Sequence, residues 1–356
     1  GFMFRRDALK WLAAAPWLSG ARWVRAAEAA PTPVPTASVE PSRTIEIEID
    51  PQTQEAAVPT SVAISPNGQL IAAGADDHRI RLWSAADGTL TTRLEEHADW
   101  VRSVAFDPSG KKLASAGDDH LVVLWDLSNT HVLHRVEVPR GIVHTVAFRP
   151  DGKTLAAAGF DAVVRIVDAA TGDVVRELQA SSTDQRAAAF SPNNQLLACG
   201  GRDGTIRIWD LEGYQVVRSI PAHRMRIRAL AYSPDGSLLA SAGDDRKFFL
   251  WDLDGKRAAT LPTPPGRIFA LAFLGPDQLA SGGSDNVIRI LDVQTRRETA
   301  HLIGHAGSVA ALAQHSDGGW LASAGFDTTI RLWKPQGTAA PLQTTQSPML
   351  APPRLR

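Results

Sequence analysis

Residue types that could form a hydrolytic centre recur at fixed spacing in this sequence. His97, Ser115, Asp119 and Trp125 follow one another at gaps of 18, 4 and 6 residues. A histidine oriented by an aspartate can take the proton of a serine hydroxyl and make that serine a nucleophile. The same types at the same gaps occur twice more, as His223, Ser241, Asp245 and Trp251 and as His305, Ser323, Asp327 and Trp333. The chemistry to consider first is therefore hydrolysis by a serine.

The surroundings of the serine favour a structural role for these sets. A catalytic serine has to be exposed, close to a base and next to a site for an oxyanion. Ser115 instead lies within Leu-Ala-Ser-Ala-Gly, which is typical of the interior of a β-strand, and one chain is not expected to carry three catalytic centres. We therefore expect the tryptophan N–H to donate to the serine, the serine to the histidine and the histidine to the aspartate. Each bond would contribute about 1 kcal/mol to stability.

Short strands joined by tight turns are predicted around each set. Near the first one, an alternating apolar run at residues 101–106 precedes a Pro-Ser-Gly turn and a second apolar run at residues 113–116. A turn at residues 117–120 and a third apolar run at residues 122–125 follow. Apolar alternation between turn residues is the pattern of β-strands.

The aspartate of the second turn shows that this unit is repeated seven times. It occurs as Asp77, Asp119, Asp161, Asp203, Asp245, Asp285 and Asp327. The steps are 42 residues long, except for one of 40 between the fifth and sixth units. A period of about 40–45 residues with four short strands per unit is the signature of a β-propeller.

These units resemble the WD-repeat β-propeller family. The Trp-Asp dipeptide of that family occurs at residues 125–126, 209–210 and 251–252, and its Gly-His dipeptide at residues 304–305. The resemblance covers residues 44–334 and implies an all-β, seven-bladed propeller with four antiparallel strands per blade. It also implies the structural hydrogen bonds that we expect within the three sets.

A strand outside the repeats is expected to close the ring. Residues 44–50 alternate strictly between polar and apolar types and precede the first repeat. Residues 335–356 contain five prolines, so this tail is expected to be mostly irregular and cannot easily supply an inner strand. We therefore predict that residues 44–50 pair as the outer strand of the last blade, which leaves no open seam in the ring.

The turn aspartate is present even in units that lack the histidine. Glu55, Pro139 and Ser181 stand at the histidine position of the first, third and fourth units. An aspartate that served only to receive the histidine proton would not be needed there. We expect it to accept backbone N–H groups of the turn. Asp161→Ala is then expected to destabilise the protein although its blade has no histidine.

Residues 1–30 have the anatomy of an export signal. Five basic side chains within residues 2–25 surround a short apolar segment at residues 11–21, and small residues follow near Ala29. Eleven apolar residues are too few for a helix to cross a bilayer, which needs about 20. The segment is expected to be an export signal or a retained N-terminal anchor that contacts a membrane through residues 1–25.

One pair of basic residues makes this segment resemble a twin-arginine signal, which exports folded proteins. Arg5 and Arg6 form the pair, whereas Phe4 and Ala8 depart from the usual pattern. A linker is expected at residues 31–43, which are rich in proline, between this segment and the propeller.

Composition argues against several classes of function. The 37 basic and 38 acidic residues leave a net charge of -1, so the global field that attracts nucleic acid is missing. Cys199 is the only cysteine, which excludes a disulfide framework or a cysteine-based metal site within one chain. The remaining histidines lack metal-binding spacing, and no phosphate loop or catalytic carboxylate pair stands out. We expect no metal, no cofactor and no catalytic residue.

The surface of the ring offers candidates for partner binding. Family geometry places the residues just before each innermost strand and each turn aspartate on one face, where partners commonly bind. Exposed tryptophan with phenylalanine and arginine neighbours is typical of interaction hot spots. These positions include Ile142, Asp76, Asp118 and Asp244. The partner-binding candidates are Trp100, Phe160, Arg202, Arg226, Arg267 and Phe326.

The function expected from the sequence is that of a non-catalytic scaffold for protein partners, exported to the periplasm as an accessory subunit of a membrane-associated complex. One alternative is a periplasmic propeller enzyme of the hydrolase or lactonase type. It would need acidic residues and histidines in the channel, where the inner strands supply mostly aliphatic and small residues together with Arg102 and Arg228. A cytoplasmic WD-repeat scaffold is the other alternative.

Overall fold

The computed structural model describes residues 37–49, 53–139, 141–315 and 317–334. Over these residues the chain forms 29 β-strands and no helix. The segment expected to be an export signal or anchor, residues 1–30, and the expected tail, residues 335–356, lie outside the described residues.

Seven sheets form the blades of the propeller, and each blade has four antiparallel strands. From the innermost strand outward, blade 1 contains β3 (Pro59–Ile64), β4 (Leu70–Ala75), β5 (Arg79–Ser84) and β6 (Leu90–Glu95). Blade 2 contains β7 (Val101–Phe106), β8 (Lys112–Gly117), β9 (Leu121–Asp126) and β10 (His131–Glu137). Blade 3 contains β11 (Val143–Phe148), β12 (Thr154–Gly159), β13 (Val163–Asp168) and β14 (Val174–Gln179).

The remaining four blades follow the same order. Blade 4 contains β15 (Gln185–Phe190), β16 (Leu196–Gly201), β17 (Thr205–Asp210) and β18 (Val216–Pro221). Blade 5 contains β19 (Ile227–Tyr232), β20 (Leu239–Gly243), β21 (Phe248–Trp251) and β22 (Arg257–Thr260). Blade 6 contains β23 (Ile268–Phe273), β24 (Gln278–Gly283), β25 (Ile288–Asp292) and β26 (Arg297–Leu302). Blade 7 contains β27 (Val309–Gln314), β28 (Leu321–Gly325), β29 (Thr329–Trp333) and β2 (Arg43–Glu46).

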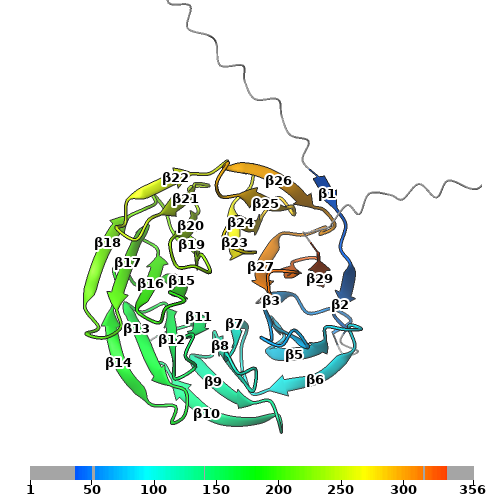
Figure 1. Cartoon of the computed structure of the whole chain (residues 1–356). Helices are drawn as coiled ribbons and strands as arrows, with labels where there is room; N and C mark the ends of the chain where they lie inside the picture. Colours follow the sequence, from blue (N-terminus) through cyan, green and yellow to red (C-terminus); the bar gives the residue numbers. More distant parts are fainter. Residues whose placement is uncertain (1–36, 50–52, 140, 316, 335–356) are drawn as a thin grey trace, which may run out of the picture. The chain divides into compact units, whose positions relative to one another are not determined.

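The blades close into a ring around a central channel. Figure 1 shows the seven innermost strands nearest the common centre. Each of them contacts the innermost strands of the two neighbouring blades, and β27 of the last blade contacts β3 of the first. The prediction of an all-β, seven-bladed propeller is confirmed.

The closing strand is β2, which comes from the N-terminal side of the repeats. It pairs antiparallel with β29, and Ile45 lies opposite Ile330. Ile45 and Ile47 are buried in the cluster that joins blades 7 and 1. The predicted closure by an N-terminal strand is therefore confirmed, with a shorter strand than the expected residues 44–50.

An additional strand lies within the range expected to be a linker. Residues Ala37–Val39 form β1, which pairs in parallel with β26 and gives blade 6 a fifth strand. Val39 packs against the cluster between blades 6 and 7. Three residues between prolines are too short for a recognisable alternation, but the unpaired edge of β26 can accept them as a further strand. Residues 37–46 therefore pair with strands of two blades, blade 6 through β1 and blade 7 through β2.

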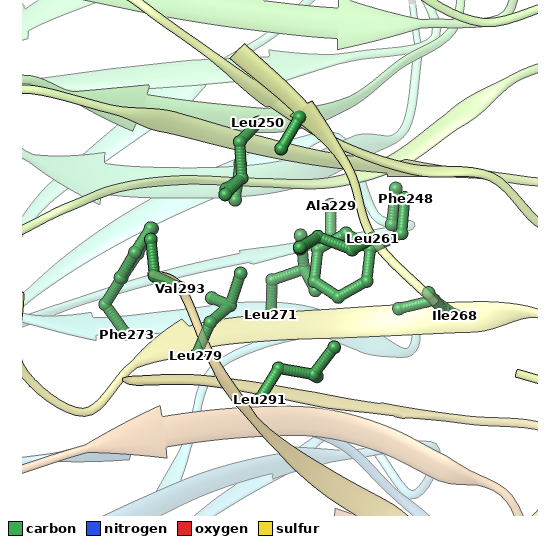
Figure 2. Packing of buried hydrophobic residues seen from close by; sticks show 13 residues of the cluster. Ala229, Phe248, Leu250, Leu261, Ile268, Leu271, Phe273, Leu279, Leu291 and Val293 are labelled. Atoms are coloured by element: carbon green, nitrogen blue, oxygen red, sulfur yellow. The ribbon is translucent and has the colours of Figure 1, made fainter. Parts of the chain in front are cut away.

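The hydrophobic core lies between the blades. Each of seven clusters combines residues of two adjacent blades. The middle strands are buried on both faces because successive side chains point to opposite sides and each side meets another blade. In the cluster between blades 5 and 6, Phe248 and Leu250 pack with Leu271 and Leu279 (Figure 2). Burial of each such side chain stabilises the fold by about 1.5–3 kcal/mol.

Candidate functional site

The first of the three sets forms a continuous chain of hydrogen bonds. Trp125 Nε1 donates to Ser115 Oγ at 2.9 Å, and His97 Nε2 lies 2.7 Å from the same hydroxyl oxygen. His97 Nδ1 lies 2.8 Å from Asp119 Oδ2. The serine accepts from the indole and donates to Nε2, so the neutral imidazole carries its proton on Nδ1 and donates it to the carboxylate.

The other two sets repeat this geometry. In blade 5 the histidine–aspartate, histidine–serine and tryptophan–serine distances are 2.9, 2.8 and 2.8 Å. In blade 7 they measure 3.0, 2.6 and 2.8 Å. The three serines are completely buried, so a substrate cannot reach them. These sets, which we call the tetrads, therefore tie a turn to two strands and do not supply a nucleophile.

Close approach at the turn explains the glycine that precedes each tetrad aspartate by two residues. A Cβ atom on Gly117 would lie 2.8 Å from the carbonyl oxygen of Trp100, 2.9 Å from Asp119 Oδ1 and 3.1 Å from His97 Nδ1. His120, the residue after the aspartate, has a φ of 68° and completes the turn in a left-handed conformation. Only glycine leaves room for the histidine and the aspartate to meet.

Burial and hydrogen bonding set the charges in the tetrads. Burial lowers the pKa of His223 and His305 below the ordinary value of 6.5. Burial alone would raise the pKa of Asp245, but the hydrogen bonds from His223 and from backbone N–H groups hold that pKa below its ordinary value. At neutral pH Asp245 and Asp327 are therefore charged while His223 and His305 are neutral.

Most turn aspartates also accept the backbone N–H two residues later. This bond is present for Asp77, Asp119, Asp203, Asp245 and Asp327. Asp161, in a blade without the histidine, instead pairs with Arg165 Nη1 at 2.7 Å. In blades 1 and 6 the aspartate likewise pairs with an arginine four residues later. In blades 1, 3 and 6 an arginine on the strand after the turn thus pairs with the aspartate where the histidine is missing, whereas in blade 4 Ser181 Oγ donates to Asp203 at 3.3 Å. These arginine partners were not expected from the sequence.

Three of the partner-binding candidates surround a cavity at the mouth of the channel. The cavity measures about 610 Å³, and its lining includes Trp100, Arg267 and Phe326. The side chains of Trp100 and Phe326 are 42% and 53% exposed. Asp76 also lines the cavity, where its carboxylate accepts the N–H of Val58 at 2.8 Å. We call this region the channel mouth.

The other three candidates lie beside or outside the cavity lining. Phe160 is 40% exposed and packs against His144 and Arg186, two residues that line the cavity. Arg226 forms an ion pair with Asp184 at 2.8 Å. Arg202 is exposed but does not belong to the lining.

The structure adds a ring of residues at the second position of each innermost strand. These residues all line the cavity and are Thr60, Arg102, His144, Arg186, Arg228, Phe269 and Ala310. Arg102 and Arg228 were expected in the channel from the sequence, whereas His144 and Arg186 were not. Their spacing of 42 residues was the available signal, and it gains meaning only when the innermost strands converge on one axis.

Carboxylates behind the ring hold its guanidinium groups. Arg186 Nε donates to Asp184 at 2.6 Å and Arg228 Nε donates to Asp244 at 2.8 Å. Arg102 forms a two-point pair with Asp118, in which Nε donates at 2.6 Å. Two-point pairing fixes the plane of a guanidinium. Arg102, Arg186 and Arg228 are therefore positioned before any partner arrives.

Within the described ranges, no group of three or more histidine, cysteine, aspartate or glutamate residues is arranged to bind a metal ion. None of the described residues forms a helix long and apolar enough to cross a membrane.

A family model described as "Nucleolar protein 10-like, N-terminal domain" matches residues 38–325, which include six of the seven turn aspartates. The chain belongs to this family of propeller domains. Its WD-repeat relatives match over short segments. Coronin-7 of Mus musculus is 37% identical over 84 residues, which is 23% of this chain and 9% of that protein.

Two more relatives show the same limited overlap. The Ribosome biogenesis protein WDR12 homolog of Brugia malayi is 36% identical over 63 residues, or 16% of this chain and 14% of that protein. The Probable serine/threonine-protein kinase PkwA of Thermomonospora curvata is 39% identical over 69 residues, or 19% of this chain and 9% of that protein. The matches span a small part of each relative. They place this propeller among WD-repeat proteins.

The ion pair of Asp161 leads to a stability prediction. Asp161→Ala is expected to lower the free energy of unfolding by about 1–3 kcal/mol, because it removes the nearest carboxylate from the largely buried Arg165 guanidinium. Urea denaturation of the two proteins measures the change. Asp173→Ala, on the exposed side of the same blade, is the matched control and should leave the midpoint unchanged. Equal midpoints for all three proteins would contradict the role assigned to Asp161.

The tetrads predict a dependence of stability on pH. Two of their histidines, His223 and His305, have a lowered pKa in the folded state, so the unfolded state binds more protons as the pH falls below about 6.5. The tetrad aspartates act in the same direction below their ordinary pKa of 3.8. The free energy of unfolding is therefore expected to fall steadily between about pH 7 and pH 3.

Urea midpoints at several pH values test this dependence. His223→Gln is expected to reduce the slope between about pH 7 and pH 5 by removing one such group, whereas His131→Gln, at an exposed position, should keep it. If the urea midpoint of His223→Gln depends on pH as steeply as that of the unmodified protein, His223 is not a source of the pH dependence.

Proposed function

We propose that this protein is a non-catalytic scaffold that binds a protein partner at the channel mouth. The observation that carries the proposal is the group of exposed aromatic side chains on one rim, Trp100, Phe160 and Phe326. The guanidinium of Arg102 lies 4.5 Å from the centre of the Trp100 ring, and Arg186 lies 5.0 Å from that of Phe160. Rigid aromatic groups next to arginines form hot spots because their burial costs little conformational entropy.

The composition of the channel favours a scaffold over a propeller hydrolase or lactonase. Such an enzyme would need acidic residues and histidines that converge on the channel. The cavity is lined by four arginines, one histidine, His144, and a single carboxylate, that of Asp76. The three tetrad serines are buried away from it. These features support a binding surface.

Loss of partner binding is the direct test of this proposal. Trp100→Ala combined with Phe326→Ala is expected to reduce co-purification of the partner from native cells at least about tenfold, since each removes a hot-spot side chain. Leu253→Ala changes an apolar residue that is also exposed but lies in the β21–β22 turn, so it should retain the partner. Quantitative mass spectrometry of the three isolates gives the comparison. Identical partner amounts in all of them would refute binding at the channel mouth.

We propose further that the scaffold is exported and serves as an accessory subunit of a membrane-associated complex. The basic and apolar pattern of residues 1–30 supports this part of the proposal. Replacing both Arg5 and Arg6 with lysine is expected to keep the protein in the cytoplasm, because a twin-arginine receptor reads the pair. Cell fractionation followed by N-terminal sequencing measures the location and any cleavage. If the unmodified protein and the variant are both found in the cytoplasm, a cytoplasmic scaffold is favoured instead.

A further inference from the structure

The cavity at the channel mouth has two chemically different walls. One wall comes from consecutive blades 2 to 5, whose second inner-strand positions are Arg102, His144, Arg186 and Arg228. The other wall comes from blades 6, 7 and 1, where the same positions hold Phe269, Ala310 and Thr60, and where Arg267 and Asp76 also line the cavity. A ligand that fills this cavity would therefore need an anionic side and an apolar side.

The carboxylates near the cationic wall leave part of each guanidinium available. Asp118, Asp184 and Asp244 do not line the cavity, and their side chains are 12%, 3% and 8% exposed. The arginines that they hold are 26%, 19% and 25% exposed, in the same order. Arg228 is held through Nε, and within the described residues neither of its Nη atoms has a hydrogen-bond partner. The N–H donors thus face the cavity while the carboxylates lie behind them.

His144 adds a neutral ring to this cationic wall. Burial and the nearby charges of Arg186, Arg102 and Arg228 lower the pKa of His144 to about 3, so its imidazole is neutral. Arg186 Nη1 lies 3.3 Å from His144 Nδ1, which must then be the acceptor, and the ring proton is on Nε2. Nε2 is buried and has no acceptor among the described residues. An unpaired buried donor of this kind costs free energy.

The charge balance indicates which anion fits. Around the channel mouth five arginines, at positions 102, 186, 226, 228 and 267, face four aspartates, at positions 76, 118, 184 and 244. With His144 neutral, this arrangement leaves one uncompensated positive charge. One carboxylate would neutralise it, whereas a phosphate dianion would leave an excess negative charge in a partly desolvated site.

We propose that the channel mouth binds a carboxylate side chain of an acidic peptide segment of the protein partner, with an adjacent apolar residue of that segment against Phe269 and Ala310. This inference rests on the proposed scaffold function and specifies the chemistry of the partner. The carboxylate accepts from the free N–H groups of Arg186 and Arg228, in pairs that are stronger than neutral hydrogen bonds.

Peptide binding to the full-length protein tests this assignment. One probe is a fluorescein-labelled peptide of alternating glutamate and leucine. The other has glutamine in place of glutamate. Fluorescence anisotropy measures the binding of each. The glutamate peptide is expected to bind at least about tenfold more tightly, and its affinity should fall as salt is raised from ~50 to ~300 mM. Equal affinities of the two peptides would overturn the proposal.

Two kinds of variant locate the binding. Ala310→Glu places a carboxylate in the cavity without breaking an ion pair and is expected to weaken glutamate-peptide binding about tenfold or more. Arg186→Gln with Arg228→Gln should have the same effect by removing donors. The matched controls, Ala86→Glu in an exposed loop and Arg176→Gln on β14, should bind as the unmodified protein does.

The remaining outcomes separate this inference from the scaffold itself. Affinity that neither Ala310→Glu nor the double arginine variant changes would overturn the carboxylate site, as would displacement of the peptide by inorganic phosphate at submillimolar concentration. If Trp100→Ala with Phe326→Ala abolishes capture of the native partner while Ala310→Glu retains it, the scaffold function stands and the carboxylate site fails.

Discussion

Packing between neighbouring blades is the interaction on which this structure depends. A single four-stranded blade has two apolar faces and cannot bury either of them alone, so each blade is stable only between two others. The seven inter-blade clusters meet this requirement for the middle blades directly. For the first and last blades it is met only when the ring closes, and β2 completes blade 7 beside blade 1. Closure therefore decides the stability of the whole ring.

The turn aspartates show how one structural task is met by different partners. In blades 2, 5 and 7 a buried histidine donates to the carboxylate and links it through serine to tryptophan. In blades 1, 3 and 6 an arginine on the strand that follows the turn approaches the same carboxylate. In either case a carboxylate in a largely buried turn gains a hydrogen-bonding or ion-pair partner, because leaving it unpaired would cost more than the interaction itself contributes. The conformation of the turn is thus kept while the sequence around it varies.

This rigidity reaches the surface where we place partner binding. The backbone N–H of Asp118 donates to the carbonyl oxygen of Trp100 at 2.9 Å, one residue before the aspartate of the first tetrad. Asp118 in turn orients Arg102, and Arg102 lies over the Trp100 ring. The tetrad, the ion pair and the exposed aromatic side chain therefore form one connected unit. A surface that is ordered before binding loses little conformational entropy when a partner docks on it.

The sequence by itself determined the repeat, the number of blades, the closing strand and the members of the tetrads. These features are local or periodic, so spacing and alternation are enough to identify them. The tertiary structure alone decided which residues share the channel mouth, because His144 and Arg186 are 42 residues apart along the chain and meet only when the innermost strands converge. It also decided the pairing of Asp161 with Arg165 and the addition of β1 to β26. Distances between blades follow from ring closure, and no single repeat contains that information.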